Sequence, residues 1–207
     1  MEADYSLELG PTAPALEIPW QDPEGRLHYV ELRGDIGREL EHRVDGIPEA
    51  QQFPALRRFL IDANTQQSAW QTVKCDVWAD ETDAMENLYG AAYTQSCYVD
   101  LVLAEQAGSL RGSLETHKSA AKELAHMLDA YEALEACAEI VVRRCYFHNT
   151  SDPERSDDGY SLTLFLIGYG ATPAAAAECW ASTMNIASEC LLKVQPHEDQ
   201  AQGSELG

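Results

Sequence analysis

The chain has few basic residues, and they are not clustered. Its 207 residues include 14 Lys and Arg against 35 Asp and Glu, which gives a formal net charge of −21. Nucleic-acid backbones and anionic lipid surfaces are both recognised by clustered Lys and Arg. The sequence therefore predicts neither a nucleic-acid nor a membrane partner. An excess of acidic residues favours solubility and basic or cationic partners instead.

Long apolar runs are also missing. No run approaches the roughly 18 residues that a membrane-spanning helix requires. Residues 1–20 carry neither the basic nor the apolar segment of a signal peptide. The six cysteines form no C-x-x-C pair and fall within helix-like or strand-like runs, as small buried thiols do. We therefore expect reduced cysteines and a cytoplasmic protein.

The length fits a single domain with short arms. Residues 1–25 hold four of the nine prolines and no periodic apolar pattern, which indicates an extended N-terminal arm. Residues 26–194 contain the periodic segments and predict a single α+β domain. Residues 195–207 are polar and predict a flexible acidic tail.

Eight segments show strand or helix periodicity. Strands are predicted where β-branched and aromatic residues alternate with others, and helices where apolar residues recur every three to four positions. In chain order these are strand 26–33, helix 49–63, strands 69–78 and 93–104, helix 114–134, strands 137–147 and 160–169, and helix 173–193.

The first six elements resemble ferredoxin-like domains in their βαββαβ order. We predict an α+β fold in which an antiparallel sheet of four to five strands carries helices on one face, with a further strand and a C-terminal helix. Without the strand at 26–33, the same elements form a four-stranded double hairpin. A helix–hairpin unit at 49–104 recurs at 114–169, and a shift of 70 residues aligns Cys75 with Cys145. This recurrence suggests an internal duplication.

Two tryptophans bracket the strand predicted at 69–78. Trp70 and Trp78 lie eight residues apart, so a regular strand places them on the same face. If no helix covers that face, the pair forms an exposed aromatic binding surface. If helices cover it, both rings belong to the core.

Asp100 interrupts an otherwise apolar strand segment, Tyr98–Val102. In one phase of the strand it faces solvent, and in the other it is a buried acid of the kind found in functional sites. A nucleophilic mechanism would need a Cys or Ser with a His base. Such groups are present, but their spacing selects no set: Cys97, Cys145, His117 and His148.

The stretch 168–173, Gly-Tyr-Gly-Ala-Thr-Pro, follows a strand and opens a helix. Main-chain N–H groups around Gly170 and Thr172 can hold an anion at such a turn. The alternative is a tight turn in which Thr172 caps the helix. The dinucleotide fingerprint lacks its third glycine and no lysine follows, so no cofactor is predicted. Within the polar loop 148–159, residues 152–159 lack the oxygen spacing of a calcium loop, and no metal site is predicted.

Two functional hypotheses of different classes follow. The first is a non-enzymatic module that binds a protein partner or a small molecule and can pair as a homo-oligomer through its sheet. The second is an enzyme of unknown reaction with a site on the open sheet face or at the hairpin loops, using Asp100, Cys97 or His148. A pocket that joins two such groups favours the enzyme, and an apolar patch on one sheet face favours the module. The candidate ligand- or partner-binding residues are Trp70, Trp78, Asp100, His148, Gly170 and Thr172.

Overall fold

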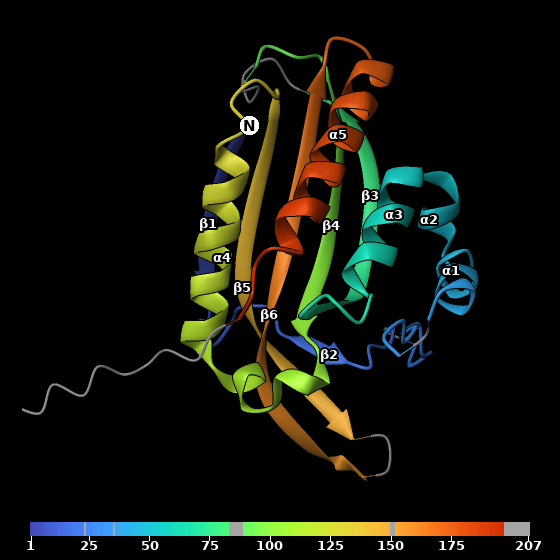
Figure 1. Ribbon diagram of the computed structural model, residues 1–207, viewed down its shortest axis with the longest axis vertical. Helices are drawn as coiled ribbons and strands as arrows, with labels where there is room; N and C mark the ends of the chain where they lie inside the picture. The colour runs from blue at the N-terminus through green and yellow to red at the C-terminus, as the bar shows by residue number, and fades with distance from the viewer. Residues whose placement is uncertain (23, 35, 83–88, 150–151, 197–207) are drawn as a thin grey trace, which may run out of the picture.

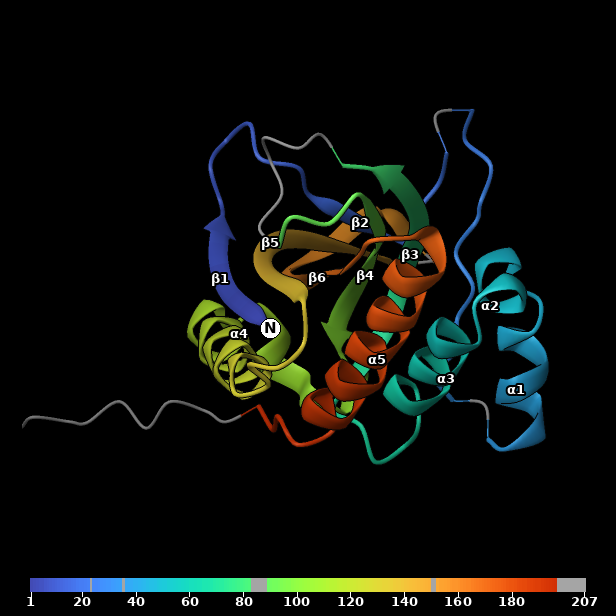
Figure 2. The same ribbon diagram turned by 90° about the horizontal axis from the view of Figure 1, so that it is seen from above.

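A six-stranded sheet with helices on one side forms the framework of the protein (Figures 1 and 2). The combination of sheet and helices confirms the α+β prediction. No helix among the described residues is long and apolar enough to cross a membrane. The computed structural model describes residues 1–22, 24–34, 36–82, 89–149 and 152–196. The tail predicted at 195–207 lies outside these residues from 197 onward.

The strand order is β1-β5-β6-β4-β3, and β2 pairs with β5 further along the same strand. β1 and β2 run parallel to β5, whereas the other neighbours are antiparallel. The sheet is therefore mixed, because the predicted N-terminal arm contributes two parallel strands. The strands are β1 (Glu2–Glu8), β2 (Leu16–Ile18), β3 (Trp70–Glu81), β4 (Tyr93–Leu103), β5 (Ala136–Asn149) and β6 (Asp152–Gly170).

The strand predicted at 26–33 is not formed, and the ferredoxin-like order is not confirmed. Only Leu27 makes a strand-like bridge there, to Gln21. One carboxylate oxygen of Asp22 accepts the N–H groups of Glu24 and Arg26 at 3.0 and 2.8 Å. An Asp side chain that bonds to the following backbone in this way winds the chain into a turn.

Helices cover one side of the sheet, as predicted (Figure 2). α4 packs on β1 and β5, α5 packs on β6 and β4, and α3 lies against α5 and β3. Shorter helices lead into α3 and α4. The helices are α1 (Arg38–Val44), α2 (Pro48–Gln52), α3 (Pro54–Ala63), the 3₁₀ helix η1 (Glu105–Gly112), α4 (Leu114–Asp129) and α5 (Pro173–Leu191).

Proline explains where the helix predicted at 49–63 differs from the structure. Pro54 has no N–H and disfavours helical angles in the residue before it. Phe53 accordingly has φ −122° and ψ 94°, and it separates α2 from α3. α1 was missed because the 34–48 segment has only two buried apolar residues, Leu40 and Val44, one helical turn apart.

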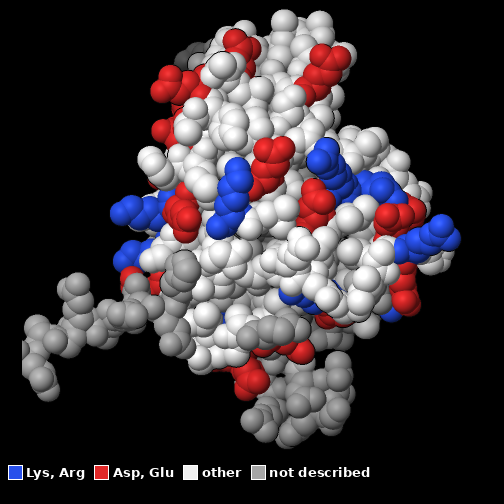
Figure 3. Space-filling view, viewed as in Figure 1, with Lys and Arg blue, Asp and Glu red and all other residues white. Residues whose placement is uncertain are grey.

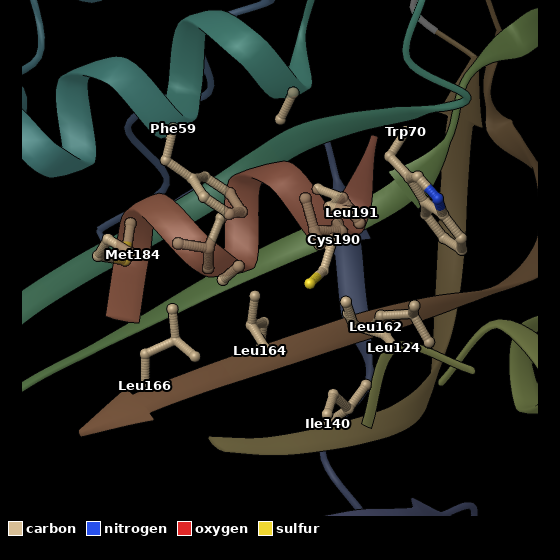
Figure 4. Close-up of a cluster of buried hydrophobic side chains, with 14 of the residues drawn as sticks. Phe59, Trp70, Leu124, Ile140, Leu162, Leu164, Leu166, Met184, Cys190 and Leu191 are labelled. Atoms are coloured by element: carbon tan, nitrogen blue, oxygen red, sulfur yellow. The ribbon is translucent and has the colours of Figure 1, made fainter. Parts of the chain in front are cut away.

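The main hydrophobic core lies between the helices and the sheet. Every second residue of the central strands points into it, including Leu162, Leu164 and Leu166 of β6, all fully buried. Figure 4 shows these leucines facing Phe59 from α3 and Met184 from α5. The opposite side of the sheet, which we call the open face, carries no helix among the described residues (Figure 2).

Two helix–hairpin units occur in the order that the sequence predicted. α3-β3-β4 and α4-β5-β6 meet through their second strands, β4 and β6, which pair antiparallel at the centre of the sheet. The residue alignment that suggested a duplication is not supported by the structure. Cys75 packs against the core under the helices, whereas Cys145 belongs to a small cluster on the open face. The shift of 70 residues therefore equates side chains on opposite faces, and only the order of elements supports a duplication.

Candidate interaction surface on the open face

A β-bulge separates the two tryptophans of β3. The register of β3 against β4 shifts between Thr72 and Lys74, so Val73 is an additional residue. Trp70 pairs with Leu103 and is fully buried under the helices, and Trp78 lies on the open face with 38% of its surface exposed. The prediction that both rings share a face is wrong, because one extra residue inverts the alternation of the strand.

Strand pairing lines up a row of residues across the open face. Asp76 of β3 pairs with Tyr98 of β4, which pairs with Phe165 of β6. Phe165 pairs in turn with Glu139 of β5, and Glu139 pairs with Asp4 of β1. The row therefore has aromatic rings at its centre and a carboxylate at each end.

The aromatic rings form a continuous strip on this face. Trp78 lies 6.4 Å from Tyr98, and Tyr98 lies 6.1 Å from Phe165, measured between ring centroids. These separations are typical of interacting rings. Burial raises the pKa of Tyr98, and the negative charges of Asp100 and Asp76 raise it further, so its hydroxyl stays neutral. We call Trp78, Tyr98 and Phe165 the aromatic strip.

Exposed carboxylates border the aromatic strip on both sides, and we call them the acidic rim. Within the described part of the chain, none of them forms an ion pair. On the helix side, by contrast, acidic and basic side chains are interspersed (Figure 3). The acidic rim consists of Asp76 and Asp80 on β3, Glu139 on β5, and Glu2 and Asp4 on β1.

Asp100 lies in the next row of the open face, below the strip. It is 7% exposed and accepts a hydrogen bond of 2.5 Å from Thr163 Oγ1, which accepts one of 3.1 Å from Arg143 Nη1. Burial raises the pKa of Asp100 and outweighs the opposing effects of Thr163, Arg143 and Lys74. Asp100, a candidate site residue, therefore forms a hydrogen-bond network with Thr163 and Arg143 in the row next to the aromatic strip.

The basic residues of this face already lie over aromatic rings. Lys74 Nζ stands 4.8 Å from the ring of Trp20 and 6.0 Å from that of Tyr98. The guanidinium of Arg143 lies 5.5 Å from the Phe165 ring. Attraction between a cation and the face of an aromatic ring contributes about 0.5–1 kcal/mol at exposed sites. Rings of the strip therefore hold cations within the protein itself.

The other groups proposed for catalysis do not converge. Cys97 lies under the helices with its Sγ 3.5 Å from Met184 Sδ, on the opposite side of the sheet from Asp100. Cys145 packs in the small open-face cluster, and His148 pairs with Glu17 of β2. Burial raises the pKa of both thiols to about 12, so they are protonated at neutral pH.

The turn at 168–173 is a packing site between α5 and β6. A Cβ on Gly170 would lie 2.3 Å from the backbone nitrogen of Ala176, and Gly168 is equally confined. The hydroxyl of Thr172 caps α5 by accepting the N–H of Ala175 at 3.2 Å. Both candidate residues therefore have structural roles at the start of this helix.

A cavity of about 750 Å³ lies where β3 begins and β4 ends. Glutamines contribute much of its polar lining, together with Glu31, Glu105 and Arg33. Arg33 Nη1 donates to the carbonyls of Thr65 and Trp70 at 2.6 and 3.2 Å, so its charge is used to hold the local backbone. The cavity contains none of the residues predicted as a site.

No protein-family model, curated protein or solved structure matches this chain. Its function therefore has to be argued from the open face and the charge around it.

Most of this surface was missed in the sequence. Tyr98 and Asp100 are two residues apart on one strand and therefore share a face. The same holds for Thr163 and Phe165 on another strand, and both spacings are visible in the printed sequence. Which residue of one strand faces which residue of the next depends on register, and no single strand contains that information. Asp4 falls within the predicted arm, outside the predicted domain. The end of the row that Asp4 forms was therefore not predicted.

Proposed function

We propose that this protein is a binding module whose open face holds a basic segment of a partner protein. The observation that supports this proposal is the row from Asp76 through Tyr98 and Phe165 to Glu139 and Asp4. Rings at the centre favour apolar or stacked contacts, and carboxylates at both ends favour basic groups at both ends of the segment.

The size and shape of the surface favour a protein segment over a small molecule. Small ligands are enclosed by concave pockets, whereas the strip lies on the surface of a sheet. Five neighbouring strands span about 19 Å at a spacing of roughly 4.8 Å. An extended chain of about six residues covers that distance. A short linear segment can therefore reach both parts of the acidic rim.

The enzyme hypothesis has less support. The structure joins Asp100 to Thr163, and through it to Arg143, with no thiol or imidazole among these hydrogen-bond partners. Cys97 lies on the other side of the sheet, and His148 is paired with Glu17. A nucleophile, a base and an orienting acid in mutual reach are required for the mechanism considered above.

Calorimetric titration with a short peptide tests the proposal. The probe is an amidated peptide of about eight residues, with both Lys and Arg at each end and leucines at the centre. The Asp76→Asn/Glu139→Gln double variant removes two rim charges. We expect its dissociation constant to rise about two- to thirtyfold, because each of the two exposed pairs that are lost contributes about 0.2–1 kcal/mol.

A charge-matched variant separates a site from the general acidity of the protein. Glu123→Gln/Asp129→Asn changes the net charge equally, at exposed positions of α4 on the helix side. We expect this variant to bind within about twofold of the wild type, since distant exposed charges are screened by salt. Equal weakening in both double variants, or no binding by the wild type, would overturn the proposal.

A further inference from the structure

Trp78 is the ring of the strip with the most evident space for an incoming group. It is 38% exposed, and Asp76 and Asp80 lie two residues before and after it on the same face of β3. A cation stacked on the indole is within reach of either carboxylate. In the described part of the structure, neither aspartate has a cationic partner.

The chemistry of the cation decides how well it fits this arrangement. A guanidinium is planar and weakly hydrated, so it can lie flat on an aromatic ring while its N–H groups point sideways to carboxylate oxygens. An ammonium is a compact and strongly hydrated charge without a planar fork. A ring with a carboxylate on either side along the strand therefore suits arginine better than lysine.

Two arginines of this protein already lie in a similar arrangement, one on β5 of the sheet and one on η1. Arg143 lies 5.5 Å from the Phe165 ring, while its Nε donates to Glu8 at 2.8 Å. Arg111 lies 4.3 Å from the Phe147 ring, while its Nε donates to a backbone carbonyl at 2.8 Å. In each case a ring contacts the guanidinium and an oxygen accepts one of its N–H groups.

We infer that the basic groups recognised on the open face are arginine guanidinium groups, and that Trp78 with Asp76 and Asp80 forms the arginine-selective position. This inference rests on the proposed function and names the chemistry of the partner at that same site. The partner segment accordingly carries at least one arginine that stacks on Trp78, next to apolar residues that cover Tyr98 and Phe165.

Three peptides of equal length distinguish this inference from the proposed function. They share the central leucines and carry only Arg, only Lys, or only citrulline, the neutral isostere of Arg, at the basic positions. In calorimetric titrations, we expect the Arg peptide to bind about 5–20-fold more tightly than the Lys peptide. The citrulline peptide is expected to bind most weakly, because it lacks the charge that the acidic rim attracts.

Variants at Trp78 locate the preference. Trp78→Ala is expected to reduce the Arg-to-Lys ratio to about twofold or less, and Trp78→Phe to retain part of it, because phenylalanine keeps a smaller ring. Tyr131→Ala is the matched control, since Tyr131 is 39% exposed and follows α4 on the helix side. Circular dichroism confirms that each variant is folded.

Each outcome bears on one of the two proposals. Equal binding of the Arg and Lys peptides, with loss of both in the acidic-rim double variant, overturns the inference and leaves the proposed function standing. An arginine preference that survives in Trp78→Ala also overturns the inference, because it places the selectivity elsewhere. If the wild type binds neither peptide, the proposed function fails and the inference fails with it.

Discussion

Substituting Gly168 by alanine tests whether the turn before α5 is a packing site. A Cβ at this position would lie 2.2 Å from the backbone nitrogen of Trp180, 2.6 Å from its Cα, and 2.8 Å from the carbonyl oxygen of Ala176. Ordinary contacts begin near 3.4 Å, so α5 has to move by about 1.2 Å. All three atoms are backbone and cannot rotate away. Overpacking usually costs about 1–3 kcal/mol, and we expect about 3 kcal/mol here.

Urea unfolding followed by circular dichroism measures this change. Gly168→Ala is expected to lower the unfolding midpoint without changing the slope, since the surface exposed on unfolding is unaltered. Gly10→Ala is the control, because a Cβ at Gly10 would have no atom within 4 Å, and we expect a change below about 0.5 kcal/mol. A Gly168→Ala protein as stable as the control would refute the packing argument.

Three further predictions follow from buried groups and sheet edges. Burial raises the pKa of Asp100, so its ionised form destabilises the fold at neutral pH, and that cost disappears below the unfolded-state pKa of about 3.9. Asp100→Asn is therefore expected to be at least as stable as the wild type in urea at pH 7, with any advantage shrinking towards pH 4; the opposite trend would contradict this. Trp70→Phe is expected to lower the free energy of unfolding by about 1–3 kcal/mol, because the carbonyl of Val194 loses its indole donor. Trp78→Phe is expected to lower it by less than about 0.5 kcal/mol. Equal losses for the two variants in urea unfolding would be inconsistent with the bulge. Light scattering is expected to give a monomer, because both edge strands carry exposed carboxylates; a stable dimer would argue against this.

The sequence predicted most of the core elements because their apolar periodicity is strong. The hairpins 69–78 with 93–104 and 137–147 with 160–169 correspond to β3-β4 and β5-β6. The hairpin loop predicted at 148–159 was too long, since β5 and β6 continue through most of it. The residues there are mostly polar, so their strand pairing leaves no hydrophobic pattern in the sequence.

Features that depend on distant parts of the chain were not predictable. β1 alternates weakly, and it becomes a strand because β5 offers it an unpaired edge. Val73 looks like any strand residue, yet as the bulge it places Trp70 and Trp78 on opposite faces. Of the six candidate residues, Trp78 and Asp100 lie on the open face, on the neighbouring strands β3 and β4. The remaining four lie elsewhere in the fold.

The positions of the acidic residues in the fold also change how the acidity of the chain is interpreted. Along the sequence, the acids near the start of the chain belong to an arm and favour solubility. In the fold, Asp4 and Asp76 lie on the two edge strands and their carboxylates accept the N–H groups of Tyr5 and Val77 at 2.7 and 2.8 Å. Each carboxylate thus occupies a main-chain donor that another strand would need, and like charges on both edges repel a second copy. The same charges that oppose pairing through the sheet edges attract a basic segment across its face, which is why we favour a partner of opposite charge over self-association.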